Sequence, residues 1–207
     1  MHTLEFFFDC SSPWTYLAFE AVQPLVQRLD VEIAWRPILV GGIFNAVNPS
    51  VYENRANPVA AKARYYQKDL RDWAGYVGVE IGQPPVFPVN SVKVMRGALL
   101  ADAAGVLVPY ARRAFQRYWG ELADISKDEE VLAIADAAGL PAADFLERIA
   151  KPVIKDQLRA NTEECVQRGG FGSPTMFVDD DDMYFGNDRL PLLFARLDDG
   201  SQSLDSE

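Results

Sequence analysis

The stretch FFFDCSSPWTY at residues 6–16 decides the fold of this chain. Its first three residues form an apolar run that is typical of an interior strand. Ser12 is a favourable N-cap, and Pro13 suits the first helical position, where a missing N–H costs nothing. Apolar residues then recur at roughly helical spacing from Leu17 to Leu29. The stretch therefore predicts a buried strand that turns directly into a helix.

The junction between this strand and this helix is the first candidate for chemistry. A helix N-terminus carries free N–H groups and a partial positive charge. Such a site stabilises an anion, and a thiolate is one such anion. Ser12 cannot supply a thiolate, but its hydroxyl can donate a hydrogen bond to one that a ligand brings.

Composition limits the class of protein. The chain has 207 residues, 49% of them apolar, which suits one domain or one domain with a large insertion. It contains no apolar run near the roughly 18 residues that span a bilayer, and its N-terminus lacks a signal-peptide pattern. Most of the net charge of −10 comes from residues 179–182 and 198–207. We therefore expect a cytoplasmic protein that binds neither membrane nor nucleic acid.

The reactive residues are few. The chain has two cysteines, Cys10 and Cys165, and one histidine, His2. This excludes a C-x-x-C redox centre and argues against a metal site and against serine-hydrolase chemistry. A reactive serine without a histidine needs another source of nucleophilicity, and a thiol carried by a ligand would provide it.

The order of the predicted elements is β-α-β, a run of helices, then β-β-α. The second strand covers residues 31–35 and is expected to pair in parallel with the first. Residues 39–44 form a loop or short helix, and residues 45–57 form a loop over the site. The remaining expectations are helices at 58–76, 91–104, 108–122, 127–138, 142–149 and 153–168, strands at 172–178 and 183–185 around a turn at 179–182, and a last helix at 190–197.

Residues 12–15, Ser-Pro-Trp-Thr, occupy the place of the C-x-x-C motif that opens the first helix of thioredoxin-like redox proteins. With this order of elements, the chain resembles kappa-class glutathione transferases and 2-hydroxychromene-2-carboxylate isomerases, a branch of the thioredoxin-like, DsbA-type proteins. The resemblance covers nearly the whole chain. It implies an α/β thioredoxin-like fold with a large all-helical insertion, and a homodimer. The domain would comprise residues 1–57 and 171–200, the insertion 58–170 and an acidic tail 201–207.

The resemblance also implies glutathione as cofactor. Ser12 would be the catalytic residue that hydrogen-bonds the glutathione sulfur, although it could be a structural N-cap. The backbone of Ser173, before a cis Pro174, would pair with glutathione like an added strand, although Pro174 could simply begin a strand. The segment that would hold the γ-glutamyl end comprises Gly186, Asn187, Asp188 and Arg189. Asp188 could instead cap the last helix.

Four residues correspond to substrate contacts of the isomerases. Asn54 and Arg55 match a pair that contacts substrate, and an arginine suits a carboxylate, although both could belong to a surface loop. Asn45 stands where the isomerases carry a lysine, and Ser91 stands where they carry a tyrosine. These two departures leave glutathione binding plausible but the hydroxychromene substrate open.

The resemblance thus predicts a glutathione-dependent cis–trans isomerase that acts on an aromatic keto acid, in aromatic catabolism, by reversible thiolate addition. The substrate ring would lie against Trp14, Phe44 and Tyr65. The alternatives are a kappa-class-like transferase or peroxidase that acts on another electrophile, a DsbA-like thiol oxidoreductase that uses Cys10, and a non-catalytic thioredoxin-like module. Cys10 itself is more consistent with a small core residue.

Overall fold

The computed structural model describes residues 2–29 and 31–202, with side chains to residue 198. The four strands occur in the predicted order, with one helix between the first two and a run of helices before the last two. The elements are β1 (Leu4–Phe8), α1 (Pro13–Leu29), β2 (Ile33–Pro37), α2 (Val40–Val47), α3 (Ser50–Ala56), α4 (Ala60–Val77), α5 (Val92–Ala103), α6 (Leu107–Phe115), α7 (Asp128–Ala137), α8 (Phe145–Ala150), α9 (Pro152–Gln167), β3 (Thr175–Val178), β4 (Asp182–Phe185), a 3-10 turn (Asn187–Arg189) and α10 (Leu190–Gln202).

The sheet has the strand order β2-β1-β3-β4. Strands β1 and β2 are parallel, with Phe6 opposite Trp35. Strand β3 is antiparallel to both β1 and β4. The predicted β-α-β start and β-β-α end are therefore confirmed, and the N-terminal stretch forms the predicted strand followed directly by α1.

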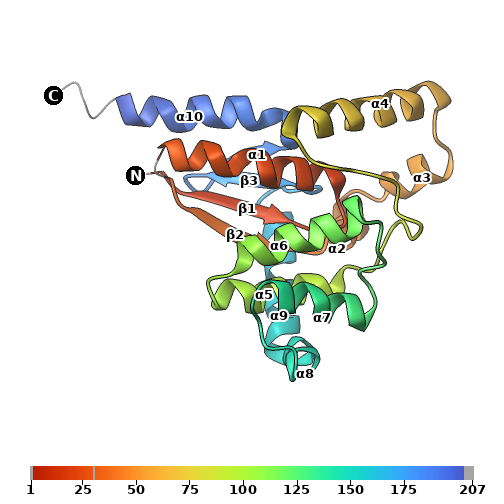
Figure 1. The fold of residues 1–207 in the computed structure, drawn as a ribbon. Coiled ribbons are helices and arrows are strands. Elements are labelled where there is room, and N and C mark those ends of the chain that lie inside the picture. Colours follow the sequence, from red (N-terminus) through yellow and green to blue (C-terminus); the bar gives the residue numbers. More distant parts are fainter. Residues whose placement is uncertain (1, 30, 203–207) are drawn as a thin grey trace.

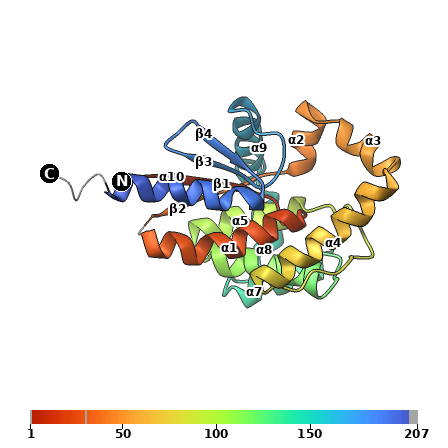
Figure 2. The ribbon, with the colours of Figure 1, turned by 90° about the horizontal axis from the view of Figure 1, so that it is seen from above.

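Helices cover both sides of the sheet. Helices α1 and α10 lie on one side, and α5 to α9 lie on the other side and beyond the β2 edge (Figure 1). Seen from above, α4 runs alongside α1, and α2 and α3 project together away from α10 (Figure 2). The α2–α3–α4 segment therefore lies at the end of the molecule where α1 begins.

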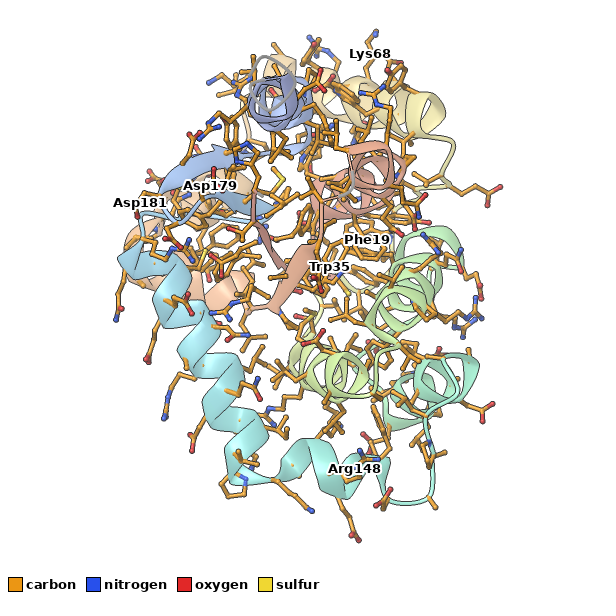
Figure 3. All side chains as sticks on the ribbon, turned by 90° about the vertical axis from the view of Figure 1, so that its left-hand side faces the viewer. Phe19, Trp35, Lys68, Arg148, Asp179 and Asp181 are labelled. Carbon is orange, nitrogen blue, oxygen red and sulfur yellow. The ribbon has the colours of Figure 1, made fainter. Side chains whose placement is uncertain are left out.

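The sheet and the helical insertion share one core. The Phe19 ring of α1 lies 4.9 Å from Trp35 of β2 and 5.3 Å from Phe115 of α6, measured between ring centroids. Figure 3 shows Phe19 and Trp35 together in the interior, with Lys68 and Arg148 at opposite outer ends. Because apolar packing is continuous across the boundary, the division at residues 58 and 170 stays a prediction. The homodimer also stays a prediction.

The predicted loop at residues 45–57 is wrong. Helix α2 continues to Val47, and α3 occupies Ser50–Ala56 after a break at Asn48-Pro49. Helix α3 buries none of its residues. It therefore carries no apolar periodicity from which a helix could be predicted.

Three smaller differences have local causes. Strand β2 extends through Pro37, which an edge strand tolerates because no neighbour needs its missing N–H. The predicted helix at 108–122 ends in a π-helical turn at Gln116–Gly120. Helix α10 continues through Gln202, so the first two residues of the predicted acidic tail are helical and the others lie outside the described residues. No helix in the described ranges is long and apolar enough to cross a membrane.

Candidate functional site

The turn between β1 and α1 holds Ser12 at the start of the helix. The Ser12 Oγ accepts a hydrogen bond from the Thr15 N–H at 3.3 Å, which is the N-cap geometry that the sequence predicts. The same hydroxyl donates to the Ser173 carbonyl at 3.1 Å. The Ser12 side chain is partly exposed. It therefore joins the helix N-terminus to the loop before β3 while remaining accessible.

That loop contains the predicted cis peptide bond between Ser173 and Pro174, which is confirmed. Ser173 is buried, and its Oγ lies 2.8 Å from the Oγ1 of Thr15. Thr15 stands in the position of the second cysteine of a redox motif. It is fully buried, and its hydroxyl forms this hydrogen bond with Ser173. The described chain offers no partner to the backbone N–H of Ser173.

A cavity of about 500 Å³ opens in front of Ser12 and Ser173. Its walls come from the β1–α1 turn, from α2, α3 and α4, from the connector before α5 and from the loop before β3. Among its aromatic residues, Trp14 contacts Tyr66 edge to face, with ring centroids 5.4 Å apart. Tyr66 lines the cavity, whereas Tyr65 is 64% exposed and is absent from its walls. The predicted contact of Tyr65 is therefore wrong, and its neighbour Tyr66 takes that place.

Arg55 lies at the mouth of this cavity. Its guanidinium carbon is 5.4 Å from the ring centroid of Phe44 and 5.3 Å from that of Phe87, so it lies against two aromatic rings. Arg55 is exposed and has no ion pair within the part of the chain that the structure describes. A guanidinium held by rings and left without an anion is suited to bind a carboxylate or another anion.

The structure places the other predicted substrate residues differently. Ser91 lines the cavity, but it is buried at the start of α5 and donates its hydroxyl to Asp9 Oδ2 at 3.1 Å. Asn45 and Asn54 are exposed and are not among the lining residues. The Asn45 Oδ1 accepts a hydrogen bond from the Tyr52 hydroxyl at 2.8 Å.

The predicted γ-glutamyl segment lies outside the cavity in the structure as described. Asn187 is buried in an apolar groove between α1, α4 and α10, and its Nδ2 has no hydrogen-bond partner among the described residues. Asp188 and Arg189 are exposed and form an ion pair at 3.1 Å. Gly186 has a φ of 98°. Of the residues predicted to contact ligand, the structure gathers six around one cavity, namely Ser12, Trp14, Phe44, Arg55, Ser91 and Ser173.

Asp9 also belongs to this site, although its place in the sequence did not predict a role for it. Asp9 is 1% exposed, and its carboxyl accepts hydrogen bonds from Ser11, Val40 and Ser91. Burial raises the pKa of the Asp9 carboxyl, and these hydrogen bonds oppose the rise. The only signal in the sequence was an acid directly after an apolar strand. The lining residue Phe87, with its cis bond to Pro88, was missed as well.

Both cysteines are buried free thiols. Burial, with a contribution from the charge of Asp9, raises the pKa of the Cys10 thiol well above its usual value. Burial raises the pKa of Cys165 to about 11. A thiol that stays protonated in the interior is a poor nucleophile. The described residues also contain no cluster of side chains that could hold a metal ion.

Comparisons with known proteins place the chain in a family. Residues 3–198 match the family model of the DSBA-like thioredoxin domain. A 2-hydroxychromene-2-carboxylate isomerase from Sphingobium xenophagum is 32% identical over 94% of this chain and 97% of its own length. Human glutathione S-transferase kappa 1 is 29% identical over 92% of this chain and 88% of its own.

The solved structures agree with this placement. A structure of 2-hydroxychromene-2-carboxylate isomerase superposes with a TM-score of 0.84 at 25% identity and covers 99% of both chains. The thioredoxin-like fold with a helical insertion is thereby confirmed. The chain belongs to the family of 2-hydroxychromene-2-carboxylate isomerases and kappa-class glutathione transferases, within the DsbA-like thioredoxin proteins.

Proposed function

We propose that this protein is a glutathione-dependent isomerase of the 2-hydroxychromene-2-carboxylate isomerase type, which acts on an aromatic keto acid in aromatic catabolism. The observation that carries the proposal is the Ser12 hydroxyl, which lies at the N-terminus of α1, faces the loop before β3 and is partly exposed at a cavity. Bound glutathione would supply a thiol that adds reversibly to a conjugated substrate and leaves again after the substrate has rotated.

The residues around Ser12 fit a small thiol peptide. The described chain offers no partner to the backbone N–H groups of Trp14 and Ser173. The Trp14 N–H belongs to the first turn of α1, where the helix dipole favours an anion. The Ser173 N–H lies in the loop before β3, where an added peptide strand could pair with it. An anionic sulfur and a peptide backbone would thus each find an unused donor.

Ser12 would have to exchange hydrogen-bond partners to act on the sulfur. A serine hydroxyl has one hydrogen, and Ser12 directs it at the Ser173 carbonyl. Rotation about the side chain would turn the same hydrogen towards a sulfur in the cavity. With the helix N-terminus this would lower the pKa of the thiol from about 8.5 towards neutral pH. Ser12 therefore orients and stabilises the thiolate, and a histidine base is not needed.

The opposite end of the cavity would bind the rest of the substrate. Arg55 offers a positive charge to a carboxylate, and the Phe44 and Phe87 rings restrict the directions in which its guanidinium can point. Trp14 and Tyr66 provide an apolar wall for an aromatic ring. An aromatic acid would match the charge at the mouth and the rings inside.

A kappa-class-like transferase or peroxidase is the second candidate. Asn45 does not line the cavity, and Ser91 donates its hydroxyl to Asp9, so neither residue offers the cavity a donor in place of the lysine and tyrosine of the isomerases. This observation favours an electrophile other than a hydroxychromene. Human glutathione S-transferase kappa 1 is nearly as similar to this chain as the isomerases are.

Calorimetric titration of glutathione, with thiolate absorbance followed in parallel, tests the proposal. Wild type should bind glutathione with a lowered thiol pKa. In the Ser12→Ala variant, the thiol of glutathione should lose its pKa shift. The kcat/KM for the aromatic keto acid should fall about 100-fold, the usual effect of removing one hydrogen-bond donor to a developing anion. Ser126→Ala is the matched control, because it removes a serine hydroxyl bonded to Asp124, away from the cavity. Absence of glutathione binding in wild type would refute the proposal.

A further inference from the structure

The Asp9 carboxyl connects three elements that surround the cavity. Its Oδ1 accepts the Ser11 N–H at 2.9 Å, within the turn that leads to Ser12. Its Oδ2 accepts the Val40 N–H at 2.9 Å, at the first residue of α2. The same oxygen accepts the Ser91 hydroxyl at 3.1 Å, at the start of α5. One side chain thus anchors walls that come from chain positions about 80 residues apart.

These contacts require a side chain with two acceptor oxygens, which a carboxylate has. Two backbone N–H groups point at different oxygens of Asp9, and each needs an acceptor. An asparagine side chain has one acceptor oxygen and one NH2 group. Its NH2 group would therefore lie against one of these backbone N–H donors, and the two donors cannot bond to each other. Burying a carboxylate in a protein interior is costly unless its hydrogen bonds are made. A buried acid that lines a ligand cavity is therefore better explained by the site than by fold stability.

The backbone of Asp9 extends the network to the loop before β3. The Asp9 N–H donates to the Ser173 Oγ at 3.1 Å, and the Asp9 carbonyl accepts the Ser12 N–H at 3.1 Å. The Ser173 carbonyl in turn accepts the Ser12 hydroxyl. Both residues that flank the proposed sulfur position are thus tied to Asp9.

We propose that Asp9 is a positioning residue for the Ser12 site, whose carboxyl fixes the β1–α1 turn against the starts of α2 and α5 and thereby sets the direction of the Ser12 hydroxyl. The effect of Asp9 on a bound thiol rests on the proposed function. The anchoring of the turn does not.

The direction in which Asp9→Asn shifts the thiol pKa of bound glutathione distinguishes a positioning role of Asp9 from a simple charge effect. A negative carboxylate near a thiolate raises the thiol pKa, so a variant that removed only charge would lower that pKa. If Asp9 acts by positioning Ser12, Asp9→Asn instead raises the pKa of bound glutathione towards that of the free thiol. We also expect Asp9→Asn to weaken glutathione binding about tenfold. Ser91→Ala, which keeps both backbone contacts of Asp9, should have a smaller effect in the same direction.

Asp124→Asn is the matched control. Asp124 also accepts a backbone N–H and a hydroxyl, both from Ser126, and it lies outside the cavity. This control should leave glutathione binding and the thiol pKa unchanged. An unchanged or lowered thiol pKa in Asp9→Asn would overturn the proposal.

Amide hydrogen exchange provides a readout that needs no ligand. In Asp9→Asn the Ser11 and Val40 amides should exchange faster, whereas the amides of α9 should keep their wild-type rates. If the wild-type protein binds no glutathione, the proposed function fails. The hydrogen-exchange measurement still decides in that case whether Asp9 anchors the turn. Unchanged exchange at Ser11 and Val40 would overturn the anchoring role.

Discussion

The two sides of the cavity are built in opposite ways. On the side of Ser12, the polar groups of Asp9, Thr15 and Ser173 are buried and bonded to one another. On the side of Arg55, α3 buries none of its residues and α4 buries Ala74 alone. The first side places the Ser12 hydroxyl within a buried hydrogen-bond network, and the second presents charge and aromatic surface on exposed helices. The proposed reaction chemistry and the proposed substrate recognition thus lie on sides of the cavity that differ in burial.

Replacement of Arg55 tests the exposed side. Arg55→Ala should reduce kcat/KM or affinity for an anionic aromatic ligand about 10- to 100-fold, because hydrogen bonds to charged groups contribute about 1.5–3 kcal/mol. A neutral ligand of the same shape should be nearly unaffected. Arg64→Ala is the control, because Arg64 is exposed on α4 and does not line the cavity. An equal loss for neutral and anionic ligands would show that Arg55 shapes the cavity rather than recognising charge.

A methyl group added to each side tests the difference in packing. A Cβ on Gly172, next to Ser173, would lie 2.7 Å from the Phe185 ring, whereas a Cβ on Gly75 of α4 would meet nothing within 4 Å. Gly172→Ala should lower the free energy of unfolding by about 1–3 kcal/mol. Gly75→Ala should raise it by about 0.5–1 kcal/mol, because alanine is the better helix former. Denaturant unfolding measures both, and equal shifts would remove the contrast between the two sides.

The reactivity of the two buried thiols tests whether this protein can carry out thiol redox chemistry. Cys10 and Cys165 should not react with an aromatic disulfide reagent at pH 8 in native protein, and both should react in denaturant, because burial raises both thiol pKa values. The folded pKa of Cys165 is about 11 against an ordinary 9.0, so the folded state keeps this proton where the unfolded chain loses it. The free energy of unfolding should therefore fall as pH rises from about 9 to 11. A fast native thiol would instead support an oxidoreductase that uses Cys10.

The sequence by itself determined the fold class, the strand-to-helix turn with Ser12 as N-cap, and the cis bond before Pro174. These follow from local signals, namely an apolar run, a capping residue followed by proline, and a motif shared with a family. It also predicted that Arg55 contacts the substrate. Arg55 lines the cavity, and the contact itself stays a prediction.

Only the tertiary structure decided which residues share the cavity. Asp9, Ser91 and Val40 are distant in the chain and meet through one buried carboxyl. The choice of Tyr66 over Tyr65 depends on how α4 is rotated against α1, which an almost wholly exposed helix leaves undetermined in the sequence. Helix α3 has no buried face and therefore no periodicity from which to predict it. Local pattern determines elements because neighbouring residues interact directly, whereas a site depends on long-range packing that no single stretch encodes.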